Sequence, residues 1–233
     1  MGDDVTDTLD AVDSLADPQV RQVLERLHAE ARAQTGRMAR AFLGHLVDRI
    51  GGRRRTATEE AQQMRDLYLP ISAKQGSFLY AVTRAAGARR VVEFGTSFGI
   101  STIYLAAAVR DTGGGKVIGS ELEPSKVRTA RANVDAAGLS AVVEIREGDA
   151  CETLRDPGGP VDLLFVDGWK DLYVPVVEIL RPHLRPGALV VADNMYSFWS
   201  ELRPYRRYMQ DPANGFRSVT VFLSDGMECS VRL

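Results

Sequence analysis

Acidic and amide side chains recur in this 233-residue sequence directly after short runs of apolar residues. Each run of Val, Leu, Ile and Phe has the length of a buried strand, and the polar side chain stands where that strand would end. The carboxyl ends of parallel strands meet at one edge of a sheet, where ligands bind in open α/β folds. We therefore expect one polar site to contain Glu93, Glu121, Asp149, Asp167, Asp193 and Asn194.

The segment after the first of these acids, Glu93, is rich in glycine. Gly95 and Gly99 let the backbone turn sharply and pass close to a ligand. A dinucleotide-binding loop would need the pattern Gly-x-Gly-x-x-Gly to hold a pyrophosphate, but position 97 is a serine. The carboxylate of Glu93 would also repel a pyrophosphate, whereas it suits the amino group of a methionine moiety. The loop therefore favours S-adenosylmethionine (SAM) over a dinucleotide.

The next two acids suit the rest of the same cofactor. Glu121 ends the second predicted strand, where a carboxylate can accept hydrogen bonds from both ribose hydroxyls. Asp149 follows the third strand and can accept from an adenine amino group. Each acid taken alone could be a solvated residue at a strand end. Three acids at successive strand ends, with glycines at the first, indicate SAM.

The polar residues after the fourth and fifth strands offer only hard oxygen ligands. Asp167 follows one strand, and Asp193-Asn194 follows the other. Carboxylate and amide oxygens favour magnesium, with calcium or manganese as alternatives, and the three histidines show no zinc spacing. A second interpretation stays open on residue types alone. Asp193-Asn194 could cap the next helix, and Asp167 could hydrogen-bond the cofactor.

Strand and helix patterns alternate from Ser72 to the C-terminus. The predicted strands are 90–94, 116–121, 142–147, 162–166 and 188–192, and the predicted helices are 100–109, 125–137 and 174–180. Asp225-Gly226 is a hairpin signal between two further runs, 218–223 and 228–233. The predicted fold class is α/β: a Rossmann-like, mostly parallel seven-stranded sheet with helices on both faces and a C-terminal antiparallel hairpin. This combination is typical of methyltransferases and unusual for dehydrogenases.

Residues 1–71 show no strand pattern and form a predicted helical segment before a domain over 72–233. Apolar residues recur at helical spacing over 20–31 and 38–50, and a short helix is predicted over 57–68. The formal net charge of −2 gives no general attraction to nucleic acid or to anionic membranes. Apolar runs fall far short of the roughly 20 residues that span a bilayer, and no N-terminal signal is seen. We therefore expect a cytoplasmic protein that does not associate with membranes.

In this order, the motifs resemble those of the metal-dependent O-methyltransferases of the catechol and caffeoyl-CoA O-methyltransferase type, which are class I SAM-dependent enzymes. The resemblance runs from about Ser72 to the C-terminus and covers Val92-Glu93-Phe94-Gly95. It implies that Glu93 meets the methionine amino group of SAM and that Ser101 meets its carboxylate. The full set of implied cofactor-binding residues is Glu93, Gly95, Ser101, Glu121, Asp149, Ala150 and Trp169.

On the acceptor side, the resemblance covers the segment 167–170 and the pair 193–194. It implies that Asp167, Asp193 and Asn194 bind a divalent cation, Mg²⁺ by the donor chemistry above. The implied reaction is an SN2 transfer of the methyl group to a metal-bound hydroxyl, with Lys170 as the catalytic base. The alternative for Lys170 is a solvated lysine paired with Asp171.

This chain departs from the catechol-type pattern near its C-terminus. Those enzymes hold a second phenol hydroxyl with a carboxylate before the last hairpin turn, but residues 216–223 contain no acid. We therefore expect a small hydroxylated acceptor, phenolic or catechol-like. The missing acid argues against binding of both hydroxyls of a catechol. The side chains of Tyr196, Phe198 and Trp199 either line its pocket or simply pack.

Two other functions stay open. The same chemistry could act on a hydroxylated nucleoside in tRNA, although the net charge does not favour nucleic acid. The arginines available for phosphate contacts are Arg53, Arg54, Arg55, Arg203, Arg206 and Arg207. A non-catalytic SAM-binding module is the other alternative, but such a module would not require Asp167, Lys170 and Asp193. Exposed N-terminal helices favour a homodimer.

Overall fold

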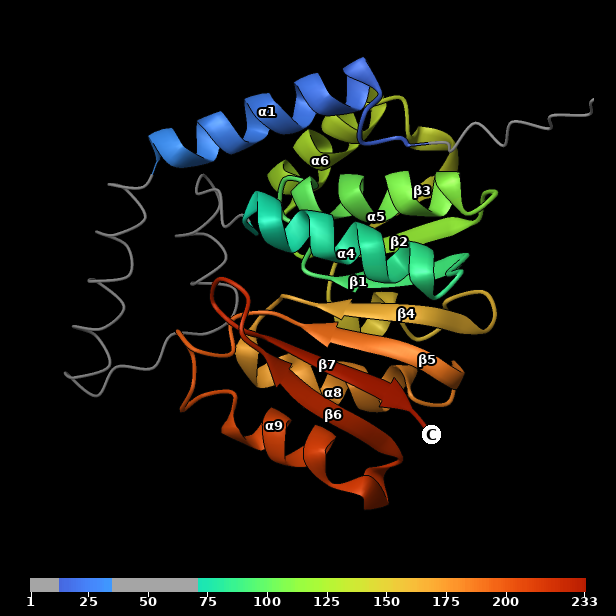
Figure 1. The fold of residues 1–233 in the computed structure, drawn as a ribbon, viewed down its shortest axis with the longest axis vertical. Coiled ribbons are helices and arrows are strands. Elements are labelled where there is room, and N and C mark those ends of the chain that lie inside the picture. Colours follow the sequence, from blue (N-terminus) through green and yellow to red (C-terminus); the bar gives the residue numbers. More distant parts are fainter. Residues whose placement is uncertain (1–12, 35–70) are drawn as a thin grey trace, which may run out of the picture.

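The computed structural model describes residues 13–34 and 71–233, so the predicted helices over 38–50 and 57–68 lie outside the described residues. The strands are β1 (Arg90–Phe94), β2 (Lys116–Glu121), β3 (Val143–Glu147), β4 (Val161–Val166), β5 (Leu184–Ala192), β6 (Phe216–Val221) and β7 (Met227–Arg232). They form one seven-stranded sheet in the order β3-β2-β1-β4-β5-β7-β6. Neighbours among β1 to β5 are parallel, whereas β7 is antiparallel to both β5 and β6 (Figure 1). The predicted fold class is confirmed.

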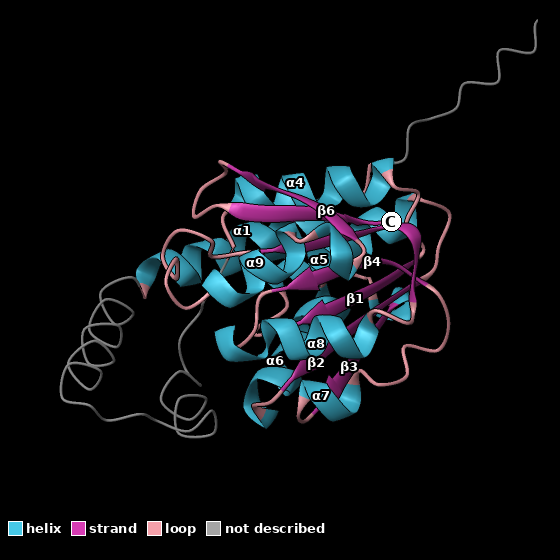
Figure 2. Cartoon of the chain, turned by 90° about the horizontal axis from the view of Figure 1, so that it is seen from below, coloured by secondary structure: helices cyan, strands magenta, loops and turns pink. Residues whose placement is uncertain are grey.

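Helices cover both faces of this sheet (Figure 2). One face packs against α1 (Pro18–Ala33), α4 (Ala73–Ala85), α5 (Ile100–Asp111) and α6 (Pro124–Ala136). The other face packs against α7 (Ala150–Thr153), α8 (Tyr173–Leu180) and α9 (Arg203–Gln210). Short 3₁₀ helices occupy Ser140–Val142, Lys170–Leu172 and Pro212–Asn214. Within the described residues, no helix is long and apolar enough to cross a membrane.

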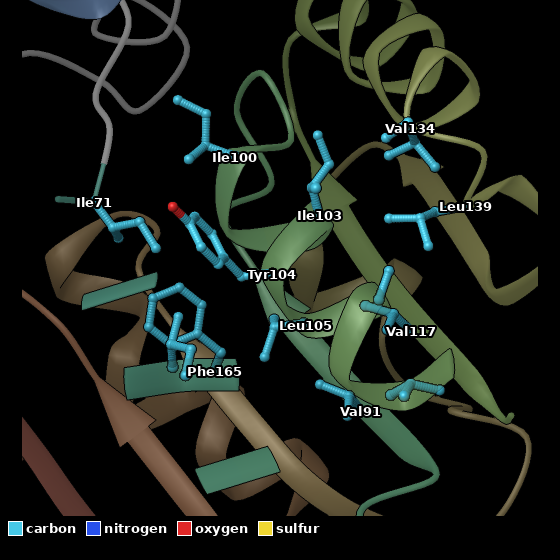
Figure 3. Packing of buried hydrophobic residues seen from close by; sticks show 14 of the residues in the cluster. Ile71, Val91, Ile100, Ile103, Tyr104, Leu105, Val117, Val134, Leu139 and Phe165 are labelled. Carbon is cyan, nitrogen blue, oxygen red and sulfur yellow. The ribbon is translucent and has the colours of Figure 1, made fainter. Parts of the chain in front are cut away.

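The continuous apolar pattern of the central strands follows from burial on both faces. In β4, Leu163 and Phe165 join the cluster under α4 and α5, part of which Figure 3 shows. Leu164 and Val166 alternate with them and join the second cluster, under α8. Successive strand side chains point to opposite faces, so a sheet covered on both sides needs apolar residues at every position.

Several predicted boundaries differ from the observed ones. The predicted strand 188–192 is the end of a longer β5 that starts at Leu184. Its first half was hidden because Arg185-Pro186-Gly187 interrupts the apolar run, and the pairing register shifts between Val161 and Leu163. Both hairpin strands begin and end earlier than predicted, and the turn between them spans 222–226 where the prediction had 224–226. Helices α4 and α9 were not predicted.

Helix α1 contributes to the same core as the strands. Its residues Val20, Leu24 and Leu27 are buried in the cluster that contains α5 and α6. The division of the chain at residues 71/72 stays a prediction, but the described part of the first segment packs on the sheet-bearing domain.

Candidate active site

The site lies where β1, β4 and β5 end, because the registers of these strands end at the same level. Phe94 pairs with Val166, and Val166 pairs with Ala192. The backbone N–H of Asp167 then donates to the Phe94 carbonyl at 2.8 Å. In the same way, the N–H of Asp193 donates to the Val166 carbonyl at 3.1 Å. The strand order reverses direction between β1 and β4, which is where open α/β sheets bind ligands.

Glu93 is fully buried at the end of β1. Its Oε2 accepts from the hydroxyls of Thr96 (3.0 Å) and Thr102 (2.5 Å), and Ser101 lies in the first turn of α5, also beside the carboxylate. Its Oε1 has no hydrogen-bond partner. Burial raises the pKa of Glu93. A buried carboxylate oxygen without a donor is costly, so this position fits a ligand that brings a donor or a positive charge.

Gly95 has a structural reason to be glycine. Its φ of 97° lies in the left-handed region, and a Cβ at this position would stand 2.5 Å from the carbonyl oxygen of Asp167. The glycine therefore lets the loop after β1 lie against the segment that carries Asp167.

The two other predicted cofactor acids organise the backbone around this loop. Glu121 accepts from the N–H of Ser97 (2.8 Å) through Oε2 and from the N–H of Glu123 (2.9 Å) through Oε1. Asp149 is exposed and caps α7 by accepting from the N–H of Cys151 at 2.8 Å. Both carboxylates stand at the same sheet edge as Glu93, at the ends of β2 and β3.

Two further predicted cofactor residues, Ala150 and Trp169, have apolar surroundings. Ala150 is 6% exposed and belongs to the cluster on the α8 face. Trp169 is half-buried and packs against that cluster. They supply apolar contact area near the carboxyl edge of the sheet.

Lys170 lies inside the acidic cluster and is not a solvated lysine. Its Nζ donates to Tyr173 Oη (2.8 Å), to the Gly168 carbonyl (3.1 Å) and to Asp167 Oδ1 (3.4 Å). It also donates to Oδ1 of Asn194. The side chain is 17% exposed. The alternative pairing with Asp171 is wrong, because Asp167 is the carboxylate that Lys170 meets.

Ionisation in this cluster is strongly perturbed. Burial raises the pKa of Asp193 to about 8, with the Asp167 carboxylate as the next cause. Burial also raises the pKa of Asp167 to about 6. The pKa of Lys170 is lowered, again chiefly by burial, while the neighbouring carboxylates act in the opposite direction. Burial is therefore the main reason that the acids and the amine of this cluster favour their neutral forms, and the neighbouring charges come second.

The donor set fits a cation. Side-chain oxygens of Asp167 and Asn194 both accept from one cationic group, Nζ of Lys170, and a further carboxyl group, that of Asp193, directly follows β5. Asn194 has φ 67°, in the left-handed region that asparagine tolerates better than most residues. Asp193-Asn194 do not cap the next helix, since α9 begins at Arg203 after Leu202. Within the described residues, no three His, Cys, Asp or Glu side chains cluster as a metal site, so this set depends on the Asn194 amide.

Three residues of the site were missed by sequence reasoning. Gln75 donates from Nε2 to Asp193 Oδ1 at 2.5 Å, and Tyr173 donates to the Asp193 carbonyl at 3.3 Å. Asp225, assigned only to a hairpin turn, accepts from the N–H of Ser197 at 2.9 Å and lies 3.5 Å from Nδ2 of Asn194. One signal was available: Ser72-x-x-Gln75 is a capping-box pattern that marks a helix start.

Of the three aromatic residues after Asn194, only Phe198 reaches the cluster, with its ring 5.2 Å from Lys170 Nζ. Tyr196 packs against Phe222, and Trp199 stacks on the guanidinium of Arg206 at 3.4 Å. Arg206 is 6% exposed, so it does not present its charge to phosphates as the RNA alternative requires. Arg53 to Arg55 lie outside the described residues.

Residues 92–195 match the family described as methyltransferase domain. The chain is similar to catechol O-methyltransferases from Niastella koreensis (35% identity over 131 residues) and Mycobacterium tuberculosis (39% over 128 residues). Each alignment covers 54% of this chain, and 58% and 57% of the respective relatives. The chain thus spans less than two thirds of the length of these relatives.

A solved structure extends the similarity over more of the chain. The crystal structure of cofactor-bound Rv0187 from MTB is 28% identical, with a TM-score of 0.66. The superposition covers 82% of this chain and 95% of that one.

Proposed function

We propose that this chain is a class I SAM-dependent O-methyltransferase of the catechol and caffeoyl-CoA O-methyltransferase type, and that it transfers a methyl group from SAM to a hydroxyl of a small catechol-like or phenolic acceptor. The observation that carries this proposal is the contact of Lys170 with Asp167 and Asn194, one strand away from the buried, half-satisfied carboxylate of Glu93. A lysine and hard oxygen ligands then face the acceptor, and a carboxylate faces the cofactor.

The first part of the proposal concerns SAM. Oε1 of Glu93 would accept from the methionine amino group, and Ser101 would donate to the methionine carboxylate. Glu121 would accept from the ribose hydroxyls, while Asp149 and Ala150 would contact adenine. The remaining proposed contacts are the close approach at Gly95 and the packing of Trp169. The unpartnered Oε1 supports this orientation, since it leaves one acceptor for an ammonium group.

The second part concerns a divalent cation, which Asp167, Asp193 and Asn194 would hold. When bound, it would supply a Lewis acid that lowers the pKa of the acceptor hydroxyl. Magnesium suits an all-oxygen set of two carboxylates and one amide. The oxygens of Asp167 and Asn194 that surround the ammonium group of Lys170 support a cation here, because they already accept from one positively charged group.

Lys170 would take the proton of the acceptor hydroxyl at Nζ. Burial lowers the pKa of this amine and so favours its neutral, basic form. Tyr173 and the Gly168 carbonyl hold Nζ at 2.8 and 3.1 Å, which fixes its position beside Asn194. The apolar ring of Phe198 covers the same amine and limits its hydration.

The decisive experiment supplies labelled SAM with magnesium and offers catechols, single phenols, hydroxylated macrocycles and bulk tRNA as acceptors. We expect label in a phenolic or catechol-like molecule, loss of activity with EDTA and recovery with added magnesium. Label retained in tRNA alone would replace this function with the RNA alternative. Full activity of thoroughly chelated protein would remove the metal from the proposal, and SAM binding without transfer to any acceptor would favour the non-catalytic module.

We also propose a homodimer. The edge strand β6 leaves Val219 60% exposed, and the neighbouring turn leaves Phe222 87% exposed. An uncovered sheet edge with apolar side chains is a surface on which copies of a chain can pair. Light scattering should give twice the chain mass at micromolar concentration, and a monomer would contradict this part of the proposal.

A further inference from the structure

Gln75 is a buried polar residue that touches the acidic cluster from outside the motifs. It lies in the first turn of α4, is 3% exposed, and donates from Nε2 to Oδ1 of Asp193 at 2.5 Å. Asp193 is itself 3% exposed. The two residues are 118 positions apart in the chain. A short, buried hydrogen bond of this kind constrains both partners.

The orientation of the Gln75 amide is determined by the start of its own helix. Its Oε1 accepts from the backbone N–H of Ser72 (2.9 Å) and from the Ser72 hydroxyl (2.8 Å). The oxygen of the amide is thus committed to the helix cap, and only the NH₂ group is left to face Asp193. An amide held in this way donates to the carboxylate and cannot turn round.

The outer end of this chain of contacts reaches the C-terminal hairpin. The hydroxyl of Ser72 lies 2.8 Å from that of Ser224, next to Asp225 in the turn between β6 and β7. The same turn holds the segment after Asn194, where the N–H groups of Met195 and Tyr196 donate to the carbonyls of Gly226 and Asp225. Helix α4 therefore contacts Asp193, and the hairpin turn contacts Asn194 and the two residues after it.

We infer that Gln75 is a positioning residue for Asp193: its fixed amide sets the rotation of the carboxylate that would bind the divalent cation. The inference rests on the proposed function, because it assigns Gln75 a part in the metal site. Residues that hold a metal ligand in place typically contribute 10- to 100-fold to metal affinity or activity. A simple capping role would instead affect the stability of α4 and no ligand in particular.

The test compares Gln75→Met with two controls by calorimetry, titrating Mg²⁺ alone and S-adenosylhomocysteine alone into each folded protein. Methionine has similar volume and no donor. Ser72→Ala weakens the cap but leaves the backbone N–H that orients Gln75. Gln19→Met removes an exposed glutamine amide that donates to the Ala136 carbonyl, far from the site. Thermal unfolding of every variant measures the loss of stability.

For Gln75→Met we expect Mg²⁺ affinity about 10- to 100-fold lower, with S-adenosylhomocysteine affinity within about twofold of wild type. Ser72→Ala should lose stability and lower Mg²⁺ affinity much less than Gln75→Met does, because the backbone N–H of residue 72 still holds Oε1 of Gln75. Gln19→Met should change neither. If wild type binds Mg²⁺ clearly and Gln75→Met binds it with the same affinity, the inference about Gln75 is wrong while the proposed metal site stands. Equal losses for both ligands would make Gln75 a structural residue. A wild-type chain that binds no divalent ion would overturn both the proposed metal site and the inference.

Discussion

Individual side chains in this site do not ionise independently. Asp167, Asp193 and Lys170 lie in one largely buried cluster. Asp167 raises the pKa of Asp193, and both carboxylates oppose the lowering of the Lys170 pKa by burial. The apparent pKa values of such a cluster describe the three groups together and cannot be assigned to one residue. A pH profile of the enzyme would therefore report the cluster, and assignment of a role to one residue needs a substitution.

Lys170 carries the proton in the proposed mechanism, so its replacement should affect turnover more than cofactor binding. Lys170→Ala should lower kcat by about 10²- to 10⁴-fold, the usual contribution of a positioned base. Lys170→Arg should fail nearly as badly, because a guanidinium keeps the charge but does not lose its proton near neutral pH. The deficit of Lys170→Ala should shrink as pH rises, since the acceptor hydroxyl then ionises without help. Steady-state kinetics from pH 6 to 10 measures both effects.

Near wild-type kcat in Lys170→Arg would contradict this role and leave Lys170 as an electrostatic or structural residue. Calorimetry with S-adenosylhomocysteine provides the control, because the lysine is proposed to face the acceptor. Its affinity should stay close to that of wild type in both variants.

Glu121 should matter for the cofactor and not for the acceptor. Glu121→Ala should cost about 1.5 to 3 kcal/mol of S-adenosylhomocysteine binding, the value of charge-assisted hydrogen bonds to two hydroxyls. Glu123→Ala is the matched control, since Glu123 caps α6 through Ser125 and is not part of the proposed site. Calorimetry that gives the same affinity for Glu121→Ala and wild type would remove Glu121 from the ribose position.

Among the elements, β4 is held at its start by one carboxylate. Asp162 accepts from the backbone N–H groups of Arg89 and Arg90 at 2.9 and 2.8 Å, and from Arg185 Nε at 2.5 Å. These contacts join the beginnings of β1, β4 and β5, at the edge opposite the site. Burial alone would raise the pKa of Asp162, but the hydrogen bonds from Arg185, Arg90 and Arg89 outweigh it and lower the pKa.

Asp162→Ala should therefore destabilise the protein by about 1 to 3 kcal/mol at pH 7, because it leaves donors without their acceptor. A carboxyl whose folded pKa is depressed stabilises the protein above its unfolded pKa of about 3.9, and this contribution is lost as pH falls toward the folded value. The difference between wild type and variant should thus be constant above about pH 5 and shrink below about pH 4.

Urea unfolding followed at several pH values measures this difference. Glu152→Ala serves as the control, because the Glu152–Arg155 pair is exposed on both sides (67% and 62%) and solvent screening leaves it little effect on stability. A difference for Asp162→Ala that persists unchanged at pH 3 would contradict the assignment to the ionised carboxylate.

For the whole molecule, one sheet couples two apolar clusters. Alternate residues of β4 belong to the cluster under α5 and to the cluster under α8. Neither helical layer can be lost without exposing one face of the central strands. Binding at the carboxyl edge should therefore stabilise the fold as a unit.

S-adenosylhomocysteine at about 100 times its Kd should stabilise the folded chain by about 2.7 kcal/mol, through preferential binding to the native state. For a domain of this size, that corresponds to an increase in Tm of about 5 to 10 °C. Calorimetry or fluorescence scans with and without the ligand measure the shift. Glu121→Ala at the same ligand concentration should show a much smaller shift. An absence of any shift in wild type would contradict SAM binding.

The local pattern of the sequence was sufficient for much of the fold. The bounds of β1 and β2 were predicted to the residue, because each begins with a basic residue before two β-branched residues and is followed by a segment with turn residues. The parallel sheet and the antiparallel hairpin followed from the same patterns. The polar residues of the site were also identifiable, since the carboxyl end of each parallel strand must lie at the same sheet edge.

Tertiary structure alone decided which side chains meet at that edge. Gln75 and Asp193 are 118 residues apart in the chain, and Lys170 and Asn194 are 24 residues apart. Neither contact can therefore be predicted from a pattern of neighbouring residues. The sequence suggested Asp171 as a partner for Lys170, whereas the backbone after β4 turns that side chain toward Asp167. Helical and strand periodicities are properties of neighbouring residues. The distances between side chains in the site depend instead on the strand order and on the packing of α4 against the end of β5.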